Sequence, residues 1–232
     1  MAEHVTCIAF DADDTLWHNE RFFKLTQARF AELLAPYAPG HDLDARLMAA
    51  ERRNIGHYGF GIKGFVLSMI ETALEVTDNA VPGAVIAELL EVGQDMLRHP
   101  VELLPHARAA VEAAKRRGMV MMITKGDLLH QEQKLAQSGL GELFDAVEIV
   151  SDKTPEVYAQ IFKTRGIAPE AAVMVGNSVK SDILPPLACG AWAAHVPHDL
   201  EWDFEKADVP ADHPRFTAMA HLGDLVDALR DG

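Results

Sequence analysis

The sequence predicts an α/β protein built on a doubly wound parallel sheet, with a helical segment inserted after the first strand. From Met119 onward, short apolar runs alternate with helical runs, which is the pattern of parallel strands joined by helices. About a hundred residues separate the first apolar run from the one at Met119, although a crossover between parallel strands needs only about a dozen. The excess therefore indicates an insertion.

The first strand is predicted at Val5–Phe10, and two carboxylates at i and i+2 follow it directly, Asp11 and Asp13. Ligands of open α/β sheets bind beyond the carboxyl ends of the strands. A carboxylate at such a position can attack as a nucleophile or hold a hard cation, and a second one can transfer protons. The simpler alternative is that Asp14 or Thr15 caps a helix starting near Leu16, which is compatible with chemistry at the two aspartates.

Residues 17–100 are predicted to form the helical insertion, and residues 1–16 and 101–232 the sheet domain. Breaks rich in Gly, Pro or polar residues divide the insertion into four helical runs: Phe22–Leu34, Asp44–Asn54, Phe65–Val76 and Ala84–His99. Pro100 and Pro105 bracket the return to the sheet domain.

The rest of the chain alternates regularly between the two kinds of element. The predicted strands are Met119–Ile123, Ala146–Val150, Ala172–Val175 and Ala191–Val196. The predicted helices are His106–Arg117, Leu128–Ser138, Pro155–Arg165, Ser181–Ala188 and Met219–Leu229. Residues 198–215 are charged and contain proline, so they are predicted as a surface loop or short strand.

Composition excludes several classes of function. The 232 residues carry a net charge of −14, which argues against nonspecific binding to nucleic acid or to an anionic membrane surface. No apolar stretch is long enough to span a membrane, and no signal peptide is expected. The two cysteines, Cys7 and Cys189, form no Cys-x-x-Cys pair, which favours free thiols in a reducing cytoplasm. The oligomeric state stays open.

Polar residues follow each of the later strands as well. Thr124 and Lys125 end the second strand, Lys153 follows the third, and Asn177 and Asp182 follow the fourth. Parallel strands end at one edge of the sheet, so these side chains are expected to converge there with the two aspartates. Carboxylate and amide oxygens suit Mg²⁺, while a hydroxyl and an ammonium suit phosphate oxygens.

In order and spacing these signals resemble the four motifs of the haloacid dehalogenase-like (HAD) hydrolase superfamily, across nearly the whole chain. The resemblance implies a Rossmann-like core and a helical cap of the C1 type. It also implies that Asp11 is the nucleophile and Asp13 the general acid and base, and that Thr124 and Lys153 bind the phosphoryl group. The metal site it implies comprises Asp11, Asp13, Asn177 and Asp182.

The function implied by this resemblance is Mg²⁺-dependent hydrolysis of a small phosphorylated metabolite through an aspartyl-phosphate intermediate. Within the same superfamily, a 2-haloacid dehalogenase and a sugar-phosphate mutase remain alternatives. The acid at Asp13 argues against the dehalogenase, because attack on carbon needs no acid there. A non-catalytic binding module is the alternative outside enzymes.

Three positions depart from the superfamily pattern or extend it. The chain has Gly176-Asn177 where the fourth motif usually has Gly-Asp, so at position 177 a neutral amide oxygen would replace a charged metal ligand. Lys125 stands where Asn is common and could contact phosphate or substrate, or simply face solvent. Lys63 lies within a Gly-x-Gly-x-x-Gly stretch that follows a helical run rather than a strand, which argues against dinucleotide binding. Lys63 is either a cap residue that helps to select substrate or an exposed lysine.

Overall fold

The computed structural model describes residues 4–230 and divides them into two compact units. The sheet unit lies within Met1–Glu20, Val101–Lys125 and Gln131–Gly232, and the helical unit comprises Arg21–Pro100 and Gly126–His130. Each unit has its own hydrophobic core.

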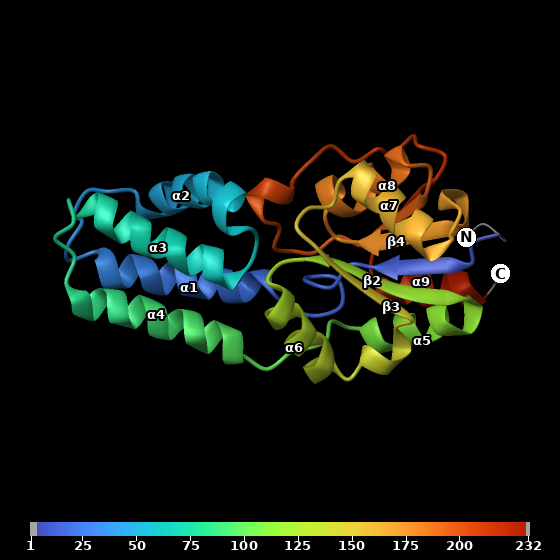
Figure 1. Ribbon diagram of the computed structural model, residues 1–232, viewed down its shortest axis with the longest axis horizontal. Coiled ribbons are helices and arrows are strands. Elements are labelled where there is room, and N and C mark those ends of the chain that lie inside the picture. Colours follow the sequence, from blue (N-terminus) through green and yellow to red (C-terminus); the bar gives the residue numbers. More distant parts are fainter. Residues whose placement is uncertain (1–3, 231–232) are drawn as a thin grey trace. The chain divides into compact units, whose positions relative to one another are not determined.

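The sheet unit contains six strands, all parallel, in the order β3-β2-β1-β4-β5-β6 (Figure 1). Their bounds are β1 Cys7–Phe10, β2 Met119–Lys125, β3 Ala146–Val150, β4 Ala172–Gly176, β5 Trp192–His195 and β6 Phe216–Ala218. The prediction of an α/β fold with a doubly wound parallel sheet is confirmed. The order reverses between β1 and β4, and this reversal is where such sheets place their ligands.

Strand β1 shows why the sheet is covered on both faces. Ile8 and Phe10 pack into a core shared with α5 (Ala107–Arg117) and α9 (Leu222–Arg230), whereas Cys7 and Ala9 pack into a core shared with α7 (Pro155–Arg165). Because successive side chains of a strand point to opposite faces, a strand between two helical layers must be apolar at every position. All four residues of β1 are buried.

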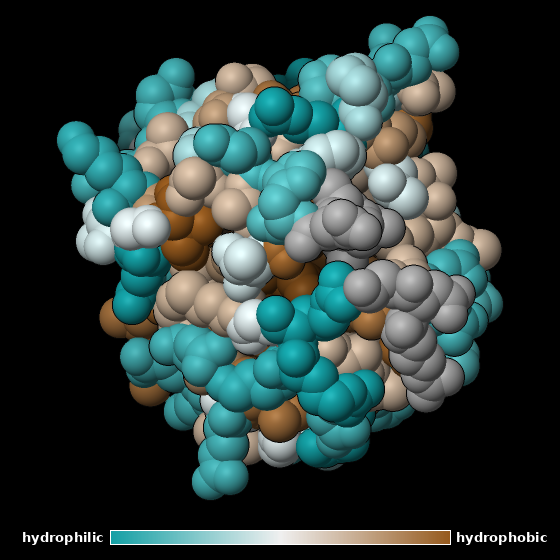
Figure 2. Space-filling view, turned by 90° about the vertical axis from the view of Figure 1, so that its right-hand side faces the viewer, coloured by the Kyte–Doolittle hydropathy of each residue, from teal (hydrophilic) through white to brown (hydrophobic). Residues whose placement is uncertain are grey.

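The remaining helical elements of the chain after the insertion include one longer helix, α6, and several short turns. They are α6 Leu128–Ser138, α8 Leu184–Ala188, the 3-10 turns η1 Gly141–Leu143, η2 Pro169–Ala171 and η4 Asp203–Glu205, and the π-helical turn η3 Val179–Ile183. The face at the right-hand end of Figure 1 mixes hydrophilic with hydrophobic residues (Figure 2).

The helical unit is built from four helices: α1 Glu20–Leu34, α2 Leu43–Tyr58, α3 Ile62–Val76 and α4 Gly83–Arg98. Their apolar stripes bury a core that includes Phe30, Met69 and Leu89. Helices α3 and α4 approach closely at Gly93, where an added Cβ would lie 2.4 Å from Cγ2 of Val66. None of the helices described between residues 4 and 230 is long and apolar enough to cross a membrane.

The stretches of the sheet unit that flank the long insertion lie beside each other. Trp17 forms an isolated antiparallel bridge with Leu103, His18 N–H donates to the Glu102 carbonyl at 3.0 Å, and Leu104 N–H donates to the Leu16 carbonyl at 2.9 Å. The stretches before and after the insertion are therefore hydrogen-bonded to each other.

Several element boundaries differ from those predicted. The first helix begins at Glu20, two residues before the predicted Phe22, and the alternative of a helix starting near Leu16 is wrong, because residues 11–19 form the loop that carries the aspartates. The helix predicted at Ser181–Ala188 begins two residues earlier, as the π-helical turn η3. Strand β6 lies just past the span predicted as loop or short strand and was not predicted as a separate strand, because it has three residues and none of them is buried.

Candidate active site

Asp11 begins the loop after β1, and the sheet fixes its backbone. Its N–H donates to the Val175 carbonyl of β4 at 2.9 Å, which continues the strand pairing by one residue. Its side chain accepts from Lys153 Nζ at 2.5 Å and from Thr15 Oγ1 at 3.1 Å. The carboxylate is thus held at the carboxyl edge of the sheet, where β1 and β4 diverge.

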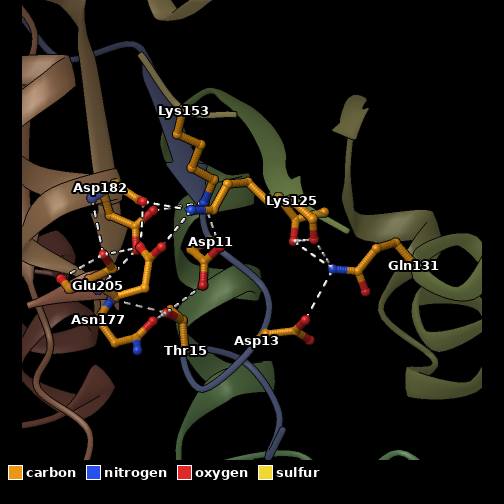
Figure 3. Close-up of polar contacts among 12 residues, drawn as sticks. Asp11, Asp13, Thr15, Lys125, Gln131, Lys153, Asn177, Asp182 and Glu205 are labelled. Atoms are coloured by element: carbon orange, nitrogen blue, oxygen red, sulfur yellow. Dashed lines mark hydrogen bonds and ion pairs between the residues drawn. The ribbon is translucent and has the colours of Figure 1, made fainter. Parts of the chain in front are cut away.

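Lys153 lies between two carboxylates (Figure 3). Its Nζ is 2.5 Å from Asp11 Oδ1 and 2.7 Å from Asp182 Oδ1, and its side chain is 1% exposed. Burial opposes the charged form of this lysine, but the charges of the two aspartates outweigh it and raise the pKa of the ammonium. Burial, followed by the charge of Asp182, raises the pKa of Asp11 to about 7, against the opposing effect of Lys153.

Asp182 is held on both oxygens. Oδ1 contacts Lys153, and Oδ2 accepts from the Ser178 N–H at 3.0 Å. Its carboxyl group packs against the α-carbon of Gly176, where an added Cβ would lie 2.4 Å from Cγ and from Oδ2 of Asp182. Glycine at the end of β4 therefore provides the space in which Asp182 reaches Lys153.

Replacing Gly176 with Ala is expected to lower the free energy of unfolding by about 1–3 kcal/mol, the usual effect of overpacking, and to reduce kcat by displacing Asp182. Thermal unfolding and steady-state turnover measure the two effects. Gly56→Ala is the matched control, because nothing lies within 4 Å of a Cβ there and the residue is inside helix α2. Equal unfolding midpoints for the two variants would contradict the prediction.

Thr15 joins the first and fourth motifs. Its Oγ1 lies 3.1 Å from Asp11 Oδ2 and 3.0 Å from Asn177 Oδ1, and it accepts from the Asn177 N–H at 3.1 Å. A hydroxyl has a single proton, so Thr15 donates to only one of the two side-chain oxygens at a time. Two hard oxygen atoms beside one hydroxyl fit a Mg²⁺ ion. Between residues 4 and 230 no group of three or more His, Cys, Asp or Glu could hold a metal.

Asp13 is bound to a different set of side chains. Its Oδ1 accepts from Lys134 Nζ at 2.5 Å and from Trp17 Nε1 at 2.6 Å, and its Oδ2 accepts from Gln131 Nε2 at 3.1 Å. Burial would raise the pKa of Asp13, but the charge of Lys134 and the three hydrogen bonds lower it below the usual value. Both oxygens of Asp13 therefore accept hydrogen bonds from side chains other than those that contact Asp11.

Gln131 connects Asp13 to the end of β2. Its Nε2 also lies 2.8 Å from Thr124 Oγ1 and 2.6 Å from the Lys125 carbonyl. Its Oε1 is buried and has no hydrogen-bond partner among the described residues. The amide thus orients the general acid expected at Asp13 and the phosphate-binding hydroxyl expected at Thr124 relative to each other.

The two additional lysines proposed from the sequence have different surroundings. Lys125 does not face solvent: its side chain is 13% exposed and its Nζ contacts Glu205 Oε1 at 2.7 Å. Lys63 is at the start of α3, is more than half exposed, and pairs with Asp127 of the same unit at 3.2 Å.

Asp14, considered as a helix cap, accepts from the N–H groups of Asn19 and Glu20 and so caps α1.

Four residues of this site were not predicted from the sequence: Gln131, Lys134, Glu205 and, as a hydrogen-bond donor, Trp17. A partial signal existed for two of them, because Gln131 and Lys134 are three residues apart in a predicted helix and so share a face. Only the structure shows that this face is buried, where polar residues usually have a specific partner.

The comparisons agree with this architecture. Residues 5–190 match the haloacid dehalogenase-like hydrolase family. The crystal structure of a haloacid dehalogenase-like family hydrolase from Xanthomonas campestris is 39% identical, with a TM-score of 0.88 over 98% of this chain and 91% of that one. A 2-haloacid dehalogenase from Pseudomonas syringae shares the fold at 19% identity and a TM-score of 0.64, over 98% of this chain and 99% of that one.

A phosphoserine phosphatase from Thermus thermophilus is 31% identical over 134 residues, which are 55% of this chain and 49% of that protein. The chain thus matches about half the length of this curated relative. The family match covers most of the chain and includes the residues around Asp11, Thr124, Lys153 and Asp182. The protein therefore belongs to the haloacid dehalogenase-like hydrolase family and is a hydrolase.

Proposed function

We propose that the protein is a phosphomonoesterase that uses Asp11 as its nucleophile. The observation that carries the proposal is the Asp11 carboxylate at the carboxyl edge of the sheet, with a buried ammonium at 2.5 Å and a second carboxylate, Asp13, two residues along the chain. Asp13 favours phosphoryl transfer over dehalogenation, because displacing an alkoxide needs a proton donor and displacing a halide does not.

In the proposed reaction, an Asp11 oxygen attacks phosphorus while the bond from phosphorus to the ester oxygen breaks, and Asp13 protonates the departing alkoxide. Asp13 then takes a proton from water, which attacks phosphorus and breaks the bond to Asp11. Lys134 keeps the pKa of Asp13 low, so we expect Asp13 to gain its proton only when the negative phosphate group arrives and raises that pKa. Lys153 and Thr124 bind the phosphoryl oxygens.

Mg²⁺ would be held by side-chain oxygens of Asp11 and Asn177, and when bound it would offset the repulsion between the nucleophile and the phosphate. Asp13 and Asp182 are also expected as metal ligands; their carboxylates contact Lys134 and Lys153, as the Asp11 carboxylate contacts Lys153. We propose that Asp182 acts by positioning Lys153.

The test is hydrolysis of p-nitrophenyl phosphate with Mg²⁺ and after treatment with EDTA. We expect turnover with Mg²⁺, a loss of at least about a hundredfold with EDTA, and recovery when Mg²⁺ is added back. Release of chloride from 2-chloropropionate, unaffected by EDTA, would instead favour the dehalogenase.

Replacing Asp13 with Asn is expected to reduce kcat by roughly 10²–10⁴-fold, because the amide cannot transfer a proton. The leaving group distinguishes the two steps. A nitrophenolate leaves without protonation, so a quench experiment should find Asp13→Asn accumulating phosphorylated Asp11 with p-nitrophenyl phosphate. An alkyl phosphate should leave the variant unphosphorylated. Equal accumulation with both substrates would contradict the role of Asp13 as acid.

We further propose that the substrate is a small phosphorylated metabolite, and that residues 17–100 are the domain that selects it, with Lys63 as one contact. A sugar-phosphate mutase remains the second candidate within the family. A cytoplasmic location stays a prediction, based on the two cysteines, which are both free.

A further inference from the structure

The Glu205 carboxylate accepts hydrogen bonds from Lys125, Ser178 and Ser181, three donors that are together called the cradle. Glu205 belongs to η4, in the loop that follows β5. Its Oε1 accepts from Lys125 Nζ at 2.7 Å, and its Oε2 accepts from Ser178 Oγ at 2.6 Å and from Ser181 Oγ. Lys125 Nζ also donates to Ser181 Oγ at 2.8 Å. One ammonium and two hydroxyls thus surround a single anion.

The pair is withdrawn from solvent, with 13% of the Lys125 side chain and 14% of the Glu205 side chain exposed. Burial would raise the pKa of Glu205, but the charge of Lys125 and the hydrogen bonds from Lys125, Ser178 and Ser181 lower it. The group in the cradle is therefore an ionised carboxylate that neutralises Lys125.

The cradle shares its loops with the proposed phosphoryl site. Lys125 directly follows Thr124, Ser178 directly follows Asn177, and Ser181 directly precedes Asp182. Figure 3 shows Glu205 on the same side as Asn177 and Asp182, with Lys125 reaching toward them across the strand ends. A substrate whose phosphate binds beside Asp11 would therefore bring its neighbouring groups close to the cradle.

The turn that carries Glu205 has a second attachment. Lys180 Nζ donates to the Phe204 carbonyl at 2.8 Å, which does not involve the Glu205 side chain. The turn is therefore also held by a contact that is independent of the Glu205 carboxylate. Besides holding the turn, the Glu205 carboxylate occupies the one position where Lys125, Ser178 and Ser181 donate together.

We propose that Glu205 is a specificity-determining residue: it fills an anion subsite next to the phosphoryl site, and so excludes substrates that carry a second anionic group near the phosphate. This inference rests on the proposed function. A carboxylate or second phosphate on the substrate would have to displace Glu205 or meet its negative charge. A neutral or cationic substituent would not, and like-charge exclusion of this kind is a common source of selectivity.

The test compares the binding of two phosphonates, whose carbon–phosphorus bond a phosphomonoesterase does not hydrolyse. Phosphonoacetate carries a carboxylate near phosphorus, and 2-hydroxyethylphosphonate carries a neutral hydroxyl there. Isothermal titration calorimetry in the presence of Mg²⁺ gives the ratio of their Kd values for the whole chain and for four variants. Glu205→Ala empties the cradle, and Glu205→Gln keeps its shape without the charge. Glu205→Ala with Lys125→Met removes the cradle's cation, and Asp203→Ala is the control in the same turn, because it pairs with Lys206.

We expect the wild type and Asp203→Ala to bind phosphonoacetate no more tightly than the neutral phosphonate. Glu205→Ala should shift the ratio of Kd values at least about tenfold toward phosphonoacetate, and Glu205→Gln should shift it in the same direction. In the double variant, adding Lys125→Met to Glu205→Ala should abolish this shift. An unchanged ratio in both Glu205 variants, no phosphonoacetate binding to either, or a shift that survives Lys125→Met would overturn the proposal. Failure to hydrolyse p-nitrophenyl phosphate would overturn the proposed function instead, since phosphonate binding requires no turnover.

Discussion

Asp11→Asn should abolish the turnover of p-nitrophenyl phosphate, with a loss in kcat of at least about 10⁴-fold, while the protein stays folded. The amide has nearly the size of the carboxylate but cannot form the covalent intermediate. It also leaves Lys153 with one carboxylate partner, Asp182. Because the proposed chemistry passes through a bond to Asp11, no other side chain of the site can substitute for it.

Two measurements accompany this variant. Acid-quenched wild-type enzyme should yield a phosphorylated peptide containing Asp11, and the variant should yield none. Asp95→Asn, an exposed aspartate of α4 that pairs with Arg98, is the matched control and should keep full activity. Residual activity within tenfold of wild type would rule out every covalent version of the mechanism.

Lys153→Met should destabilise the protein by about 3–5 kcal/mol, the usual consequence of removing one partner from a buried ion pair. Two carboxylates face this ammonium, and its removal leaves both of them in a desolvated site. Activity should be lost as well, because the phosphoryl group would lose its buried cation. Chemical denaturation with and without Mg²⁺ measures the effect, and added Mg²⁺ should restore part of the lost stability.

The control for this prediction is Lys163→Met, the same substitution at an exposed lysine of α7. It should change the free energy of unfolding by less than about 0.5 kcal/mol. Similar midpoints of unfolding for the two variants would show that Lys153 contributes no more than a surface lysine.

The sequence could predict which residues meet at the edge of the sheet. Asp11 and Thr124 follow an apolar run directly and Lys153 follows one after two residues, and parallel strands must all end at the same edge. This argument needs only the alternation of strands and helices and the handedness of their connections. Positions close behind a strand are thus determined by topology.

Other features depend on packing, which the pattern does not encode. Gln131 and Lys134 lie in a helix, where a polar residue can face solvent or the site depending on how the helix is rotated on the sheet. Glu205 is 80 residues from Lys125 in a polar stretch that resembles an ordinary surface loop. The contact between Asp182 and Lys153 depends on the space beside Gly176, which no motif reveals.

The paired stretches around Trp17 and Leu103 have a consequence for the order in which the chain folds as the ribosome releases it. Strand β1 is buried on both faces, yet its neighbours β2 and β4 begin only at Met119 and Ala172. Nearly all of the helical unit is contiguous and emerges before either neighbour. The local contacts of the helical unit can form early, whereas β1 remains an unpaired apolar segment until β2 and β4 have been synthesised. Because the chain returns to Trp17 at Leu103, a collapsed helical unit delivers β2 close to β1 and shortens the loop that must close.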